Sequence, residues 1–328
     1  MSKIKVSQNS RFELERAVEL LDLVEEAHKR YAQAKAEPEW NWDTDYRRPI
    51  ILNGKRYNVL KYLGFAQYFL AIRRRVPFGF IAQQENNIFV VFRGTMNSAE
   101  WISNFKACQE PFLDLSLPLN RQIALDDDDD PFLEDTDSIM KEHDKFNLGI
   151  LAQDIGEVHR GFYRTYTRLD RGGLLDGTPA NDRPSMKESV ETTLNNLAQD
   201  SQIFVTGHSL GGALATIAAL HISKMNSFNP PILYTFASPR VGDQRFAQQF
   251  ENLECYRIAN SEDLVPTIPL ATKLLTLRAS LAGITGLWKN HLSKMDYQHI
   301  GEPLYFTTQK GSVSDNHTIP VYQEALNG

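Results

Sequence analysis

One short motif restricts the fold of this chain more than any other feature. Gly207-His208-Ser209-Leu210-Gly211 fits the pattern Gly-x-Ser-x-Gly, and it follows a short apolar strand expected at Ile203 to Val205. A helix is expected directly behind it, from Leu210 to Ser223. In such a strand–turn–helix setting the sharp turn exposes the serine hydroxyl, and the start of the helix offers free N–H groups to an oxyanion. The motif therefore predicts that Ser209 is a nucleophile rather than part of a Gly-rich turn.

The segments around this motif predict the α/β class. Strands are expected at Ile232 to Phe236 and at Cys255 to Ile258, with a short helix at Arg245 to Phe250 between them. Earlier in the chain, Phe78 to Gln83 and Ile88 to Phe92 are β-rich runs separated by a polar turn. Alternating strands and helices imply a largely parallel sheet with helices on both faces. Because no repeat or linker divides the chain, we expect a single domain over residues 1–328.

Three further helices are expected outside this core. Ser10 to Glu13 fits a capping box, in which a hydroxyl and a carboxylate each satisfy a backbone N–H at the helix start. Behind it, apolar residues recur at helical spacing to about Ala36, within an N-terminal helical extension of about residues 1–60. Leu60 to Arg74 is a second expected helix. Ser185 to Glu188 form another capping box, at the start of the third expected helix.

The charge of the chain excludes one class of partner. The net charge is −6, whereas binding to nucleic acid phosphates needs a basic surface. Five consecutive aspartates, Asp126 to Asp130, lie in an acidic insertion of about residues 108–157. Like charges at this density resist packing, so we expect a solvated surface segment. Calcium binding is a lesser alternative, because the run lacks the Asp-x-Asp alternation and the glycine of an EF-hand loop.

Cysteine usage and hydropathy bear on the compartment. The chain has two cysteines, Cys108 and Cys255, too few for a disulfide framework or a four-thiolate zinc site. The first residues have no apolar core of the kind that a secretory signal needs, and no window reaches the roughly 18 apolar residues of a membrane span. We therefore expect a soluble protein in the cytoplasm or peripherally on a membrane. A secreted form whose signal has been removed stays open as an alternative.

Several ordered segments resemble one known family. Val205 to Ala215, around Ser209, looks like the nucleophile segment of the class 3 lipases, the fungal-type triacylglycerol lipase family of α/β-hydrolase fold. The other matching segments are Val91 to Thr95, Val158 to Phe162, Thr235 to Gly242, Asn260 to Pro266, His299 to Glu302, and His317 with Tyr322. The resemblance runs from about residue 88 to 323. It implies an α/β-hydrolase with a mostly parallel central sheet and helices on both faces.

A nucleophilic serine needs a base, and the base needs an acid that orients it. In this fold they follow in the order Ser, Asp, His. Asp263 comes after the strand at Cys255 to Ile258 and before Val265-Pro266, which places it at the strand edge where such acids lie. The family resemblance selects the same residue. The alternative is a surface aspartate in a turn.

Three histidines compete for the role of base. His317, in a loop before a C-terminal helix, resembles the catalytic position of the family, although Asn316 stands where the family often has an acidic residue. His299 resembles a structural histidine, and His291 lies in a basic stretch where a solvated side chain is expected. The resemblance therefore favours His317 as the base.

The same resemblance assigns an oxyanion site and a lid. The two oxyanion donors are expected to be the backbone N–H of Leu210 and a donor of Thr95, whose hydroxyl can add a further bond. Trp101, Ile102 and Phe105 share one face at helical spacing and correspond to the lid of the family; an ordinary docked surface helix is the alternative. Residues 270–297 combine apolar and basic positions, which suits an interfacial helix or, with slightly more weight, a core-docked one.

These residues together predict a serine carboxyl-ester hydrolase that cleaves acyl esters of lipids, like a triacylglycerol lipase, through an acyl-enzyme. A phospholipase A1 or galactolipid acyl hydrolase using the same triad is the first alternative. An inactive lipid-binding protein that retains the lipase fold is an alternative of another class. The expected partner is a lipid ester, with a membrane or droplet surface as one setting for the encounter. No cofactor is expected for this chemistry, and no metal-binding motif is visible.

Overall fold

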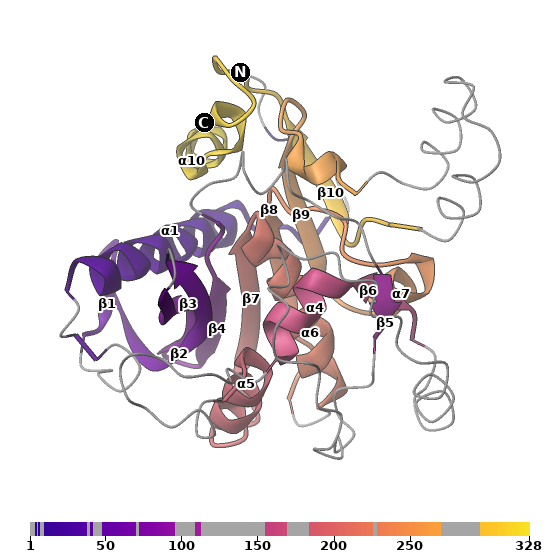
Figure 1. Ribbon diagram of the computed structural model, residues 1–328. Coiled ribbons are helices and arrows are strands. Elements are labelled where there is room, and N and C mark those ends of the chain that lie inside the picture. The colour runs from indigo at the N-terminus through magenta and orange to yellow at the C-terminus, as the bar shows by residue number, and fades with distance from the viewer. Residues whose placement is uncertain are drawn as a thin grey trace, which may run out of the picture.

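A mixed β-sheet runs through the computed structural model of the protein (Figure 1). The structure describes residues 4, 6, 10–37, 40–41, 48–69, 72–95, 109–112, 155–168, 184–225, 228–269 and 296–328. Within these residues, eight strands form one sheet in the order β1-β2-β3-β4-β7-β8-β9-β10. Its first four strands pair antiparallel, and each pair from β4 to β10 is parallel.

The strands of this sheet are β1 (Ile50–Leu52), β2 (Lys55–Phe69), β3 (Ile72–Gln84), β4 (Asn87–Phe92), β7 (Gln202–His208), β8 (Ile232–Phe236), β9 (Cys255–Asn260) and β10 (Glu302–Phe306). A separate antiparallel pair is formed by β5 (Gln109–Pro111) and β6 (Glu157–His159). The parallel strands all end at the same edge of the sheet. Side chains that directly follow β7 and β9 therefore meet at this edge, as ligand-binding groups of open α/β sheets do.

Helices cover both faces of the sheet and bury two apolar cores. One core contains side chains from α4 (Arg160–Thr167), α5 (Met186–Leu194), α6 (Leu210–Lys224) and α7 (Gln244–Gln248). The other contains side chains from α1 (Leu14–Ala36) and α10 (Ile319–Asn327). Short 3-10 helices, η2 (Val265–Thr267) and η3 (Asp315–His317), complete the described elements. No helix among the described residues is both long enough and apolar enough to cross a membrane.

The strand sequences explain why both faces are covered. In β4, Ile88, Val90 and Phe92 enter one core, whereas Phe89 and Val91 enter the other. Successive side chains of a strand point to opposite faces, so a continuous apolar run requires a layer on each side. Helix α6 is buried on every side from Leu210 to Ile222, as expected of a helix that is apolar all round.

The second half of the sheet agrees with the sequence prediction, since β7, β8, β9, α6 and α7 lie within a few residues of their expected bounds. The predicted helix from Leu60 to Arg74 is wrong. Residues 60–69 belong to β2 and residues 72–74 to β3, and the two strands pair antiparallel with register shifts near Val59 and Leu63. The physical reason is pairing: β4 needs an antiparallel neighbour in β3, and β3 needs one in β2, so the long hairpin overrides the local helical spacing.

The two predicted capping boxes differ in outcome. At α5 the box is present, because Ser185 Oγ accepts from Glu188 N–H and Glu188 accepts from Ser185 N–H. At α1 the prediction is wrong, because the N-terminal cap is Glu13, which makes no side-chain capping bond. Ser10 Oγ instead donates to Glu302 at 2.8 Å, so a contact with the start of β10 replaces the local one. The helix nevertheless ends at Ala36 as expected.

Some predicted features lie outside the described residues. These are the lid residues Trp101, Ile102 and Phe105, the aspartate run Asp126 to Asp130, His291, and most of the stretch 270–297.

Candidate active site

Ser209 occupies a strained turn between β7 and α6. Its backbone dihedrals are φ 59° and ψ −128°, a region that non-glycine residues rarely adopt and that costs on the order of 1–3 kcal/mol. The Ser209 N–H donates to Phe236 O at 2.9 Å, which attaches the turn to the end of β8. Helix α6 begins at the next residue, Leu210. This is the local geometry that the Gly-x-Ser-x-Gly motif predicted.

Two glycines make this turn sterically possible. A Cβ at Gly207 would lie 2.1 Å from Gly211 O, and a Cβ at Gly211 would lie 2.3 Å from Arg93 O. Both distances are far below van der Waals contact, so only glycine permits the start of α6 to pack this closely. The same packing brings the end of β4, where Arg93 lies, against the turn that carries Ser209.

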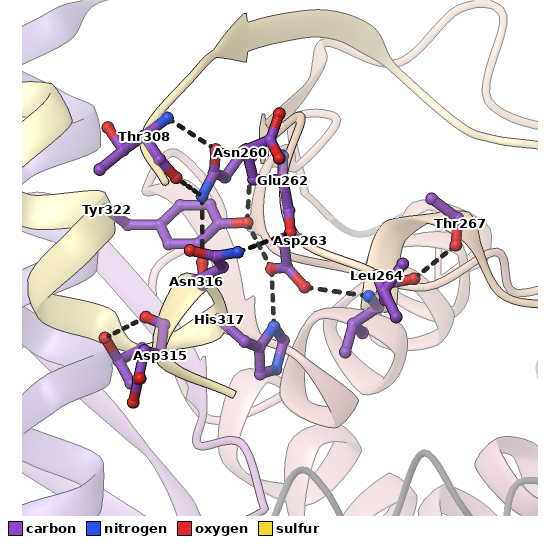
Figure 2. Close-up of polar contacts among 12 residues, drawn as sticks. Asn260, Glu262, Asp263, Leu264, Thr267, Thr308, Asp315, Asn316, His317 and Tyr322 are labelled. Atoms are coloured by element: carbon purple, nitrogen blue, oxygen red, sulfur yellow. Dashed lines mark hydrogen bonds and ion pairs between the residues drawn. The ribbon is translucent and has the colours of Figure 1, made fainter. Parts of the chain in front are cut away.

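Asp263 and His317 form a buried pair at the same edge of the sheet (Figure 2). The Nδ1 atom of His317 lies 2.7 Å from Asp263 Oδ2, and both side chains are at least 97% buried. Two more donors hold the carboxylate. Tyr322 Oη donates to Oδ2 at 2.8 Å, and Val265 N–H donates to Oδ1 at 2.9 Å. Because Nδ1 of His317 is bound to this well-held carboxyl group, the ring of His317 is fixed with Nε2 pointing away from the acid.

A pair of asparagines joins the acid loop to the histidine loop, as Figure 2 shows. Asn260 Nδ2 donates to Thr308 O and Asn316 O, and its Oδ1 accepts from Thr308 N–H. Asn316 Nδ2 donates to Glu262 O at 3.0 Å. The backbone segments before Asp263 and before His317 are therefore connected directly. Asn316, which departs from the acidic residue often found in the family, acts here as a connector between the two loops.

His208 directly precedes the serine and contacts the predicted base. Its ring centroid is 4.6 Å from that of His317, and His208 directly precedes Ser209 in the chain. Burial, followed by the neighbouring His317 and His28, lowers the pKa of His208 well below its ordinary value, so its ring is neutral. A neutral ring at this position packs against His317 without adding a second positive charge.

Several buried polar atoms at this site have no hydrogen-bond partner within the described structure. They are Ser209 Oγ, His317 Nε2, Thr95 Oγ1 and His208 Nε2. Buried polar groups are normally satisfied, and a cluster of exceptions calls for an explanation. Free serine and imidazole atoms are what a nucleophile and a base would present to a substrate, and such bonds often tighten only in the substrate complex.

The predicted oxyanion residues lie on the two segments that border Ser209. Leu210 is the first residue of α6, where backbone N–H groups have no partner within the helix. Thr95 follows Arg93 and Gly94 at the end of β4, the strand next to β7. Arg93 is buried, and its Nε donates to Pro77 O at 3.1 Å.

His299 lies beside two arginines. Its neighbours include Arg257 and Arg240, and burial together with these two cations lowers the pKa of His299 to about 2. Its ring is therefore neutral and far from basic enough to act as a general base near neutral pH. This geometry agrees with the distinction that the sequence drew between His299 and His317.

Sequence reasoning assigned no role to Asn260, His208 or Tyr322, although all three occur in the quoted segments. Tyr322 Oη accepts from Asn260 N–H as well as donating to Asp263. Burial and the Asp263 charge raise the pKa of Tyr322 well above its ordinary value, so it remains a donor. The available signal was its position five residues after His317, slightly more than one turn into the C-terminal helix.

Comparisons with known proteins identify the family of the chain. A family model described as lipase (class 3) matches residues 89–273, a stretch that includes Ser209 and Asp263. A relative is phospholipase A1-II 5 of Oryza sativa, 28% identical over 199 residues that cover 57% of this chain and 36% of the rice protein. The chain thus spans about a third of that relative's length.

Two solved structures are similar in fold. A lipase from Rhizopus microsporus has a TM-score of 0.50 at 17% identity, covering 92% of this chain and 78% of the other. MDLA from Penicillium cyclopium has a TM-score of 0.52 at 16% identity, covering 94% and 84%. The α/β-hydrolase fold with a partly antiparallel and mainly parallel central sheet is therefore confirmed.

Removing the Tyr322 hydroxyl tests the support of Asp263. We expect Tyr322→Phe to lower kcat for ester hydrolysis by about 10-fold, since Asp263 loses one of its donors and holds His317 less rigidly. Loss of a buried bond to a charged group should also lower the free energy of unfolding by about 1.5 kcal/mol. Activity assays and urea unfolding measure the two effects.

Tyr305→Phe is the matched control for this prediction. Tyr305 lies half-exposed on β10 and contacts Arg257 rather than Asp263. The same change of side chain there should leave kcat unaltered. Equal kcat values for wild type and Tyr322→Phe would contradict the prediction that the Tyr322 hydroxyl holds Asp263 in place.

Proposed function

Since the chain belongs to the class 3 lipase family, we propose that it is a serine carboxyl-ester hydrolase that cleaves acyl esters of lipids. The observation that carries the proposal is the buried Asp263–His317 pair beside the strained turn of Ser209. A serine at the start of a helix, an imidazole whose distal nitrogen is free, and an acid on its other nitrogen are the parts needed for acyl transfer.

The first half of the reaction forms an acyl-enzyme. Ser209 Oγ attacks the ester carbonyl carbon while His317 Nε2 removes the hydroxyl proton. The carbonyl oxygen becomes negative and receives hydrogen bonds from the Leu210 N–H and from Thr95. When the tetrahedral intermediate collapses, the bond to the alcohol oxygen breaks and His317 returns the proton to that oxygen. The alcohol leaves, and the acyl group stays on Ser209.

The second half releases the acid. Water attacks the acyl carbon, and His317 Nε2 takes one of its protons. The second tetrahedral intermediate collapses, the bond to Ser209 Oγ breaks, and the serine regains its proton from His317. The carboxylate of Asp263 stabilises the imidazolium formed in each half, and burial strengthens this interaction because little water screens it.

Two lipid classes are candidate substrates for this centre. The first is triacylglycerol, which the resemblance of the sequence motifs to the fungal-type lipases implies. The second is a phospholipid cleaved as by a phospholipase A1, which the rice relative favours by its name. Both reactions use the same acyl-transfer steps and differ in the alcohol that leaves. We also propose that the lipid is met at the surface of a membrane or droplet, where water-insoluble esters are concentrated.

Loss of the nucleophile tests the mechanism directly. We expect Ser209→Ala to keep the fold, since alanine is smaller, and to lower kcat by about 10⁶-fold, as for loss of such a nucleophile elsewhere. A fluorophosphonate should label the wild type covalently and leave Ser209→Ala unlabelled. Wild-type hydrolysis rates in a folded Ser209→Ala variant would contradict the mechanism, and an unlabelled, inactive wild type would favour the lipid-binding alternative.

The comparison of His317 with His299 gives a second test. His317→Ala should resemble Ser209→Ala in severity, because triad members act as a unit. His299→Ala should retain kcat within about 3-fold, since the low pKa of the His299 ring makes it unsuited to act as the base. Steady-state kinetics with thermal unfolding as a check on folding measure both. A folded but inactive His299→Ala beside an active His317→Ala would mean that the roles are exchanged.

A substrate panel separates the two lipid classes. We expect the wild type to release fatty acid from triacylglycerol emulsions and from phosphatidylcholine vesicles, with the higher rate on triacylglycerol. Ser209→Ala provides the blank for each lipid. A higher rate on phosphatidylcholine, with lysophospholipid as the second product, would assign the protein to the phospholipase A1 reaction instead.

A further inference from the structure

Helix α1 lies outside the stretch matched by the family model, yet one of its side chains bonds to the loop beside Ser209. His28 Nε2 accepts a hydrogen bond from Gly94 N–H at 3.1 Å, across 66 residues of sequence. Gly94 directly precedes Thr95, the residue expected to supply an oxyanion donor. A residue of the N-terminal extension therefore contacts the segment on which that donor lies.

The position of Gly94 is determined by contact with the nucleophile turn. A Cβ at Gly94 would lie 2.9 Å from His208 O and 3.2 Å from the Ser209 Cβ. Gly94 thus packs directly against the two residues of the turn. Since glycine has no side chain to restrict its dihedrals, the orientation of its two peptide groups must be fixed by other contacts.

Those contacts exist on both sides of Gly94. The N–H of the first peptide group donates to His28, as described above. The carbonyl of the second accepts from Arg93 Nη1 at 2.8 Å. This second peptide group also contains the Thr95 N–H, which points opposite to the carbonyl because a trans peptide is planar. Holding the carbonyl of Gly94 therefore sets the direction of the Thr95 N–H.

Helix α1 also supports Arg93. The guanidinium carbon of Arg93 lies 3.9 Å from the ring centroid of Tyr31, three residues after His28. The same carbon lies 4.3 Å from the ring centroid of Phe78. His28 and Tyr31 face the same way because residues three apart share a helix face. One turn of α1 thus holds both residues that precede Thr95.

We infer that His28 is a positioning residue for the oxyanion loop: by accepting the Gly94 N–H, it fixes the peptide group before Gly94 and, together with the Arg93 bond to the next peptide group, helps to aim Thr95 at the oxyanion. This inference rests on the proposed function. Oxyanion donors act over 2.7–3.1 Å, and a misplacement of about 1 Å can cost on the order of 100-fold in rate. A bond that holds the loop should therefore affect the chemical step more than substrate binding.

The bond requires a neutral imidazole, because a protonated Nε2 cannot accept. Burial and the Arg93 charge lower the pKa of His28 to about 3. The groups that face it support the neutral form, since Arg93 repels a second cation and His208 is itself neutral. The acceptor is thus retained throughout the pH range in which a hydrolase of this type works.

Three substitutions of His28 separate positioning from simple packing. His28→Gln keeps an acceptor oxygen at about the distance of Nε2, His28→Asn shortens the side chain by one bond, and His28→Leu removes the acceptor. The control is Val24→Ala, one turn earlier on α1, where a buried side chain is truncated in the same core. It lowers stability without contacting Gly94.

The measurements are kcat and KM on a soluble short-chain ester, with active sites counted by fluorophosphonate labelling. We expect His28→Leu and His28→Asn to lower kcat by about 10- to 100-fold with KM nearly unchanged. His28→Gln should recover most of kcat, and Val24→Ala should keep kcat per active site. If His28→Leu does not fold, the positioning role of His28 is tested by comparing the kcat of His28→Asn with that of His28→Gln.

The two proposals fail in distinguishable ways. An inactive wild type, or a fully active Ser209→Ala variant, would overturn the proposed function and this inference together. Normal kcat in folded His28→Leu and His28→Asn, beside an inactive Ser209→Ala, would overturn the inference alone. Equal losses in Val24→Ala and His28→Leu would mean that His28 contributes only to packing, which also overturns it.

Discussion

The close packing of the turn at Ser209 is the constraint on which the rest of the site depends. A serine at φ 59° is held there by its bond to Phe236 O and by two glycines that allow α6 to approach β4. Because the turn is strained, the surrounding contacts must supply the energy that keeps it. The buried helix α6 does so, since it cannot leave the sheet without exposing an apolar surface on every side.

The Asp263–His317 pair depends on contacts between parts of the chain that are distant in sequence. Asp263 follows β9, whereas His317 and Tyr322 lie at the C-terminal end, and the bonds of Asn260 and Asn316 connect them. These bonds join residues that are 54 to 59 positions apart in the sequence. A buried polar network of this kind is stabilising only when its members are satisfied, and the described bonds satisfy Asp263 and both asparagines. The same contacts bury the pair away from water, which strengthens the electrostatic interaction between Asp263 and His317.

Sequence analysis correctly predicted the elements that are determined by residues close together in the chain. The β7–turn–α6 unit follows from spacing and glycine placement within a dozen residues, and α5 begins at the predicted capping box at Ser185. Sequence analysis was wrong where contacts with distant parts of the chain determine the local structure. Residues 60–69 and 72–74 form strands because β3 pairs with both β2 and β4, and Ser10 bonds to Glu302 rather than capping α1. Apolar spacing in a single segment carries no information on such partners.

The candidate site likewise combines residues that a local motif predicts with contacts that no local motif predicts. Ser209 was predicted from its motif, and Asp263 and His317 were proposed from order and resemblance, whereas the bond from His28 to Gly94 joins elements that no local pattern relates. The family-matching stretch 89–273 contains the serine and the acid but lacks His317, Tyr322 and all of α1. The base, a donor to the acid and a support of the oxyanion loop thus come from flanking segments. Because these segments pack against each other on one face of the sheet, their shared core couples the two sides of the site.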